Sequence, residues 1–149
     1  MPWGGNIAST IVNSTAIATA GQKVALIGQV FWEGRPSSAK TVSSAGGAIG
    51  FLSGTTTWAN ASSALRLGFQ SLSTSGGIPA QPDGSWSGAY SDIVPGTTAI
   101  SGSAWNNIAM LTGSSSITHG DYIAIVFDLT AKAGSDSVVV ASKDSLSQG

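Results

Sequence analysis

The sequence predicts an all-β protein, an antiparallel two-sheet β-sandwich that is jelly-roll-like and has about eight strands. Short runs of β-branched and aromatic residues recur between clusters of Gly, Ser, Asn and Pro, which is the pattern of strands and turns. No long run shows the helical period. Turn residues at 82–84, 95–97 and 119–121 separate the later runs at intervals that suit an antiparallel sandwich.

The first half of the chain supplies two strand regions. Residues 22–32 (QKVALIGQVFW) are apolar on both parities, which predicts a central strand covered on both faces. The runs 40–44 and 48–53 are separated by Gly46 and Gly47, and they form either one bent strand or two strands.

Residues 64–73 (ALRLGFQSLS) alternate, with Leu65, Leu67 and Phe69 on the face that should be buried. Leu72 falls on the other parity, so we expect a bulge near residues 70–71 or the end of the strand. The stretch 76–86 (GGIPAQPDGSW) is interpreted as a corner between neighbouring strands, because it combines prolines with an Asp-Gly turn pair.

Further strands are expected at 86–94, 106–112, 121–130 and 137–142. In the third of these, alternate bulky side chains predict the best core strand; they are Ile123, Ile125, Phe127 and Leu129.

A chain of 149 residues is long enough for one domain with a single core. We divide it into an N-terminal arm or edge strand at 1–21, a β-sandwich domain at 22–142 and a polar tail or linker at 143–149. The N-terminal segment is small, β-branched and uncharged, so it can add backbone hydrogen bonds to the sheet edge of a neighbouring subunit. Its candidate docking residues are Ile7, Ile11, Val12 and Ile17.

Composition excludes several classes of partner. Only 9% of residues are charged, the net charge is −1, and the six Lys and Arg are scattered, so no basic stripe follows a nucleic-acid backbone. No run approaches the roughly 20 apolar residues of a membrane span, and the N-terminus lacks the features of a signal peptide. We therefore expect neither a nucleic acid nor a membrane as partner.

The residues that carry chemistry are few and dispersed. His119 and Glu33 stand in separate turns without a visible base, nucleophile and orienting group, so the chain is predicted to be non-enzymatic, with no catalytic residues. With no cysteine and no cluster of His or Asp at metal-ligand spacing, no metal and no cofactor is expected. Asp83 is interpreted as a turn residue followed by Gly84.

Tryptophans are the sharper candidates for binding. Trp32 is expected in the core. For each of Trp58, Trp86 and Trp105 three alternatives stay open: a place in the core, a place in a subunit interface, or a platform on which a sugar ring stacks. These three are the candidate contacts for a glycan or a protein partner.

The order of these features resembles β-sandwich domains in virion structural proteins of tailed bacteriophages, of the capsid decoration or fibre type. The likeness covers roughly residues 22–142 and includes VALIGQVFW, LRLGFQSLS, GIPAQPDGSW and ITHGDYIAIVFDL. In the corner motif the matching residues are Gly77, Pro79, Asp83 and Gly84, although the corner is longer here. In the later strand they are Gly120, Asp121, Ala124, Ile125 and Val126.

That resemblance implies a structural component of a virion, assembled in the host cytoplasm, and brings no catalytic residues with it. Its implied partners are other virion proteins and further copies of the chain, in a homo-oligomer such as a trimer. The alternative function is a carbohydrate-binding module that recognises a receptor or host-surface glycan through the tryptophans.

Overall fold

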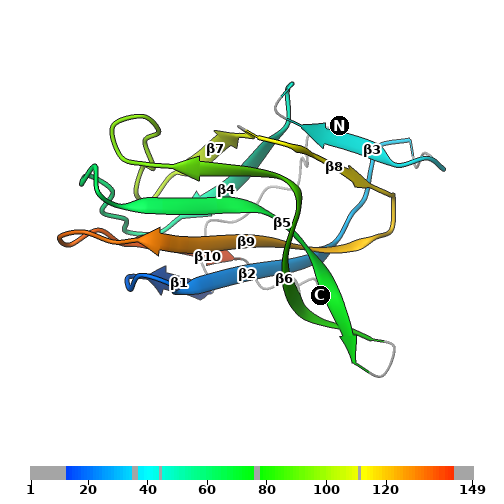
Figure 1. Ribbon diagram of the computed structural model, residues 1–149, viewed down its shortest axis with the longest axis horizontal. Coiled ribbons are helices and arrows are strands. Elements are labelled where there is room, and N and C mark those ends of the chain that lie inside the picture. The colour runs from blue at the N-terminus through cyan, green and yellow to red at the C-terminus, as the bar shows by residue number, and fades with distance from the viewer. Residues whose placement is uncertain (1–12, 35–36, 44, 76–77, 111, 143–149) are drawn as a thin grey trace, which may run out of the picture.

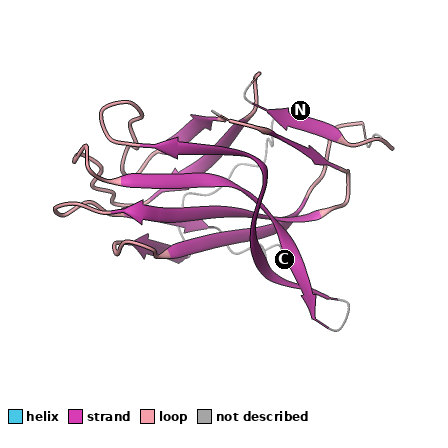
Figure 2. Ribbon diagram, viewed as in Figure 1, coloured by secondary structure: helices cyan, strands magenta, loops and turns pink. Residues whose placement is uncertain are grey.

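The computed structural model describes residues 13–34, 37–43, 45–75, 78–110 and 112–142, and this part of the chain contains ten strands and no helix (Figures 1 and 2). The strands are β1 Asn13–Ile17, β2 Lys23–Gln29, β3 Lys40–Ser43, β4 Ala48–Ser53, β5 Ala64–Ser75, β6 Ile78–Ile93, β7 Trp105–Ala109, β8 Ser114–Ile117, β9 Tyr122–Ala131 and β10 Val138–Ser142.

Eight strands form two four-stranded antiparallel sheets, ordered β1-β10-β4-β7 and β2-β9-β5-β6, and β3 pairs with β8 in a separate two-stranded sheet. The chain passes directly from one four-stranded sheet to the other between β1 and β2, β4 and β5, β6 and β7, and β9 and β10, and the first strand lies beside the last. This is the strand order of a jelly roll, so the predicted fold class is confirmed.

The core lies between the two four-stranded sheets, where alternate side chains from both meet. Leu65 and Leu67 of β5 and Phe127 and Leu129 of β9 are fully buried on one sheet. Phe51 of β4 meets Phe127 edge to face, with ring centroids 4.9 Å apart, which is a favoured aromatic geometry. The alternation predicted for Leu65, Leu67 and Phe69 is therefore correct. The bulge or strand end expected near residues 70–71 is wrong, because β5 continues to Ser75 and the register shifts on both sides of Gln70 place the extra residues in β6.

The predicted central position of residues 22–32 is wrong. β2 ends at Gln29, and among the described strands it pairs only with β9, at the edge of its sheet. Its apolar residues follow both parities because Leu26 packs against the core, whereas Ile27 on the other face is exposed to solvent.

The two runs between residues 40 and 53 are separate strands. β3 joins β8, whereas β4 lies in a four-stranded sheet and buries Ile49 and Phe51. Strand β8, with the sequence SSSI, had no counterpart in the prediction, because three consecutive serines resemble a loop.

The corner predicted at 76–86 is also wrong in its position. Most of the stretch belongs to β6, which pairs with β5 as an antiparallel hairpin, and residues 76–77 lie outside the described residues. Asp83 and Gly84 form part of a bulge within β6: Asp83 Oδ1 accepts a hydrogen bond from Ser85 N at 2.8 Å, and Gly84 has a φ of 86°. The turn chemistry is present, but it bends a strand instead of joining two.

Strand β1 pairs with β10 along Asn13–Ile17, so of the two alternatives the edge strand applies to these residues. The sandwich therefore includes β1, and a domain boundary at residue 22 is too late. Ile17 is fully buried in the core, which removes it from the candidate docking residues. Ile7, Ile11 and Val12, like the tail at 143–149, lie outside the described residues.

Asp136 is a buried charged group that fastens the loop before β10 to the loop between β4 and β5. Its two carboxylate oxygens accept hydrogen bonds from Ala59 N at 3.1 Å and Asn60 N at 2.9 Å. Burial alone would raise the pKa of Asp136, but hydrogen bonds from Ser63, Asn60 and Ala59 and the charge of Lys132 together lower it.

We predict that Asp136→Asn destabilises the fold by about 1–3 kcal/mol at neutral pH, because the amide presents a donor to a backbone N–H. Since the folded pKa is depressed, the contribution of the carboxylate is present above the unfolded pKa and is lost as pH falls through the folded value. Urea denaturation of both proteins at neutral pH and near pH 3 should show a larger acid loss for the wild type. An equal loss in the two proteins would contradict this role of Asp136.

Candidate functional site

The structure places the three candidate tryptophans on different elements and does not bring them together. Trp58, between β4 and β5, is half-buried against the core and donates its indole N–H to Thr98 O at 3.1 Å. Trp105 on β7 is 67% exposed and lies over Gly50, where an added Cβ would be 2.5 Å from the ring. Trp86 on β6 belongs to a group of polar and aromatic side chains.

That group, the Arg66 cluster, consists of Arg66, Trp86, Tyr90 and Asp92 on the outer face of the β2-β9-β5-β6 sheet. Strand pairing sets Arg66 opposite Asp92, Gly68 opposite Tyr90 and Gln70 opposite Trp86. Alternation turns Leu65 and Leu67 inward, so Arg66 points outward. Gly68 carries no side chain, and this leaves room for Arg66 and Tyr90 to meet.

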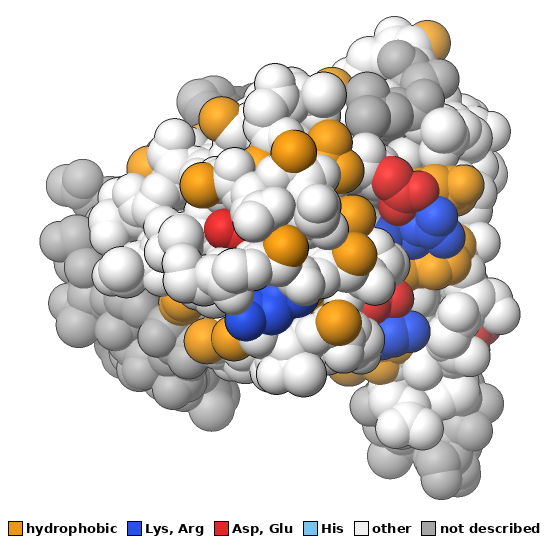
Figure 3. All heavy atoms as spheres, turned by 60° about the vertical axis from the view of Figure 1, so that its left-hand side comes forward, with side chains coloured by type: hydrophobic (Ala, Val, Ile, Leu, Met, Phe, Trp, Pro, Cys, Tyr) orange, Lys and Arg blue, Asp and Glu red, His pale blue; other side chains and the backbone are white. Residues whose placement is uncertain are grey.

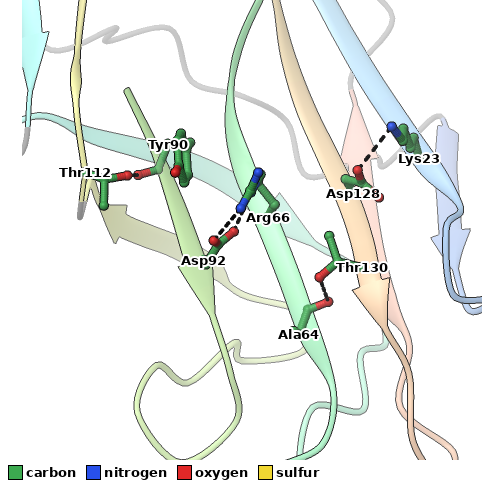
Figure 4. A network of polar contacts seen from close by, with 8 residues as sticks. All are labelled: Lys23, Ala64, Arg66, Tyr90, Asp92, Thr112, Asp128 and Thr130. Atoms are coloured by element: carbon green, nitrogen blue, oxygen red, sulfur yellow. Dashed lines mark hydrogen bonds and ion pairs between the residues drawn. The ribbon is translucent and has the colours of Figure 1, made fainter. Parts of the chain in front are cut away.

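Arg66 is the centre of the cluster. Its Nε and Nη2 donate to the two oxygens of Asp92, each at 2.6 Å, in a bidentate pair (Figure 4). The guanidinium carbon lies 4.4 Å from the Tyr90 ring centroid and 5.8 Å from that of Trp86, within the range of cation–π contacts. The hydrogen bond to Asp92, aided by its charge, raises the pKa of Arg66.

A second ion pair lies on the same face, where Lys23 Nζ of β2 is 3.2 Å from Asp128 Oδ2 of β9 (Figure 4). Each positive charge here is therefore set against a negative one. The space-filling view shows charged side chains at few places on the face it presents, and toward its right-hand side blue groups lie beside red ones (Figure 3). The face combines aromatic surface with compensated charge, so its chemistry favours an uncharged polar ligand over a strong anion or cation.

Two bulges in β6 position the aromatic residues. From Tyr90 to Trp86 the strand advances four residues while β5 advances two, and the extra length contains Gly88. Gly88 has a φ of 87°, and a Cβ there would be 1.9 Å from Ser114 O, so only glycine permits this approach of β6 to β8. The bulge keeps Trp86 and Tyr90 on one face, with ring centroids 6.2 Å apart.

Gln70, which pairs with Trp86, is buried, with 1% of its surface exposed. Its Oε1 accepts a hydrogen bond from Gly84 N at 3.2 Å, whereas its Nε2 has no hydrogen-bond partner among the described protein atoms. The amide therefore fixes the second β6 bulge, at the cost of burying a donor.

His119 and Glu33 are the residues considered for catalysis. His119 Nδ1 accepts a hydrogen bond from Trp32 N at 3.0 Å, and its ring meets Phe31 edge to face. Trp32, half-buried against the core, also donates its indole N–H to Ile117 O. Glu33 is exposed, and within the described ranges no three His, Asp or Glu side chains are grouped as metal ligands. None of the described segments is a helix long and apolar enough to cross a membrane.

Comparison with known proteins finds no match to a family model, to a curated protein or to a solved structure.

Sequence reasoning named Trp86 but missed Arg66, Tyr90 and Asp92. A signal was available, because Trp86, Tyr90 and Asp92 share one parity in WSGAYSD, and Arg66 lies on the polar parity of LRLGFQ. Which outward faces would become neighbours depended on the pairing of β5 with β6 through two bulges, and parity alone does not give that register.

We predict that Gln70→Met leaves stability unchanged or raises it by up to about 1 kcal/mol, because the substitution keeps the volume and removes a buried donor. Gly84 is exposed, so its N–H can turn to water. Gln70→Ala is the contrasting variant and should be destabilised by about 2 kcal/mol or more through the cavity it leaves. Denaturant titration compares the three proteins, and a large loss in Gln70→Met would show that the amide is needed.

Proposed function

We propose that this chain is a non-enzymatic structural subunit of a tailed-bacteriophage virion, a capsid decoration or fibre protein that docks on other virion proteins as a homo-oligomer. The observation that carries the proposal is the jelly-roll order of its two four-stranded sheets, an architecture that recurs in viral capsid and lectin domains. The sequence resemblance over residues 22–142 points to the same class.

The surface supports an assembly role. Charged residues make up 9% of the chain. On the outer face of the β2-β9-β5-β6 sheet, each of the two ion pairs joins one positive and one negative side chain. Subunits with such a surface can pack closely, because little electrostatic repulsion acts between them. In a particle with many copies, weak docking contacts gain avidity from the lattice.

Docking through the N-terminal segment is part of the proposal, now limited to Ile7, Ile11 and Val12. Because β1 begins at Asn13 and completes the sandwich, a deletion that tests the segment must stop at residue 12. A longer deletion would remove the buried Ile17 and confuse docking with folding.

The test is immunogold labelling of purified particles by electron microscopy, with the full chain and with a variant lacking residues 1–12. We expect the full chain on the particle, and reduced incorporation of the variant with an unchanged circular dichroism spectrum. Absence of the full chain from particles would refute the virion assignment. Equal incorporation of the two forms would refute docking through the N-terminal segment alone.

A second candidate function, carbohydrate binding, is favoured by the Arg66 cluster. Trp86 and Tyr90 offer apolar ring faces, and the neighbouring guanidinium–carboxylate pair of Arg66 and Asp92 offers donors and acceptors for hydroxyl groups. Trp58 is engaged with Thr98 and contributes no free platform, whereas Trp105 offers a second, isolated one.

On a glycan array we expect Trp86→Ala to lose about tenfold or more in affinity, the equivalent of about 1–1.5 kcal/mol for a stacking aromatic ring. Trp105→Ala is the matched control, since it removes an exposed tryptophan from the other sheet. Loss in the control alone would transfer the site to Trp105. No binding by the wild type at millimolar sugar would refute this second function and leave the assembly role standing.

A further inference from the structure

The outer edge of β2 is a sheet edge without a partner strand in the part of the chain that the structure describes. No described strand pairs with it on the side away from β9. Proteins blunt such edges with charges, prolines or bulges. β2 has the sequence KVALIGQ, with one charge at its first residue, no proline and an unbroken register along β9.

The direction of its backbone groups follows from the pairing with β9. Val30 N donates to Asp121 O at 2.8 Å, and Leu129 N donates to Gln22 O at 3.0 Å, so the even-numbered residues of this segment turn their polar backbone groups toward β9. Because the direction alternates along a strand, the N–H and C=O groups of Lys23, Ala25, Ile27 and Gln29 point to the open side.

Apolar surface accompanies this edge. Ile27 is 48% exposed, and Phe31 and Tyr122 at the far end of β2 are 56% and 54% exposed. Beside the edge is an apolar groove of about 260 Å³, lined by Leu26, Val30, Trp32, Phe69, Ile123 and Ile125. Gly28 also lines this groove, and a Cβ added there would meet nothing within 4 Å, so the groove is open at this point of β2.

We propose that a second copy of this chain occupies the edge, with β2 pairing antiparallel to β2 across a two-fold axis at Leu26. The two four-stranded sheets then join into one continuous sheet of eight strands. The inference rests on the homo-oligomer of the proposed function and specifies its interface, but it does not depend on a location in a virion.

The register follows from the residues. With the axis at Leu26, Lys23 lies opposite Gln29 and Ala25 opposite Ile27, so all four outward-facing residues find partners of the kind that exchange two hydrogen bonds. The overlap uses the full length of the strand. It also places no like charges opposite one another, and each Lys23 keeps its own partner Asp128.

A single cysteine tests the axis, because the natural chain has none. In the proposed register, position 26 faces itself as a non-hydrogen-bonded pair with Cα atoms about 4.5 Å apart, which a disulfide can bridge. Mild oxidation of the full-length Leu26→Cys protein should therefore give a covalent dimer. Ala109→Cys, on the edge strand β7 of the other sheet, is the control and should remain largely uncrosslinked.

A second variant tests the interface without relying on a partly buried position. Wild-type protein is expected to sediment as a dimer, and Ile27→Lys, which adds a charge at an exposed site of the edge, as a monomer with an unchanged circular dichroism spectrum. Ala109→Lys, which adds a charge at an exposed position of the other sheet's edge, should remain a dimer. A wild-type monomer at about 100 μM, a trimer, or a dimer unaffected by Ile27→Lys would overturn the proposal.

Because particle labelling is measured separately, a chain found in virions without β2 pairing would refute only this interface.

Discussion

The pairing of β5 with β9 is the contact on which the rest of this protein depends. These two strands are the central members of their sheet, and they bury Leu65, Leu67, Phe127 and Leu129 against the opposite layer. The outward-facing Val126 of β9 is also nearly inaccessible, so this strand is covered on both faces. Every other strand of the sheet is positioned by hydrogen bonding to one of these two.

From that central pair the two edges of the sheet take opposite characters. On the β6 side, bulges and long side chains build a polar and aromatic face around Arg66, with charges that compensate one another. On the β2 side the strand is regular, nearly uncharged and open. We propose a small polar ligand for the first edge and another strand for the second. The same sheet can therefore carry two kinds of recognition without a change in its core.

The alternation in residues 64–73 was sufficient to predict the buried face of β5, because the parity of a half-buried strand reflects its two environments. It did not predict the bulges, which lie in the partner strand β6. For β2 the same reasoning failed, since Ile27 shows that an apolar side chain can face solvent at a sheet edge. Serine-rich β8 could not be predicted from its composition, because it is a strand through its pairing with β3. The Arg66 cluster joins residues from two strands, and local sequence does not encode their relative register.

The approach of Gly88 to Ser114 has a bearing on how such a surface could diversify. The approach that requires glycine is between the backbone of β6 and the main-chain oxygen of Ser114, so this bulge does not depend on which side chains stand at positions 86 and 90. Trp86 and Tyr90 can therefore be exchanged for other residues while the bulge at Gly88 is kept. Variants that retain this glycine could alter what the face binds by changing only Trp86 and Tyr90.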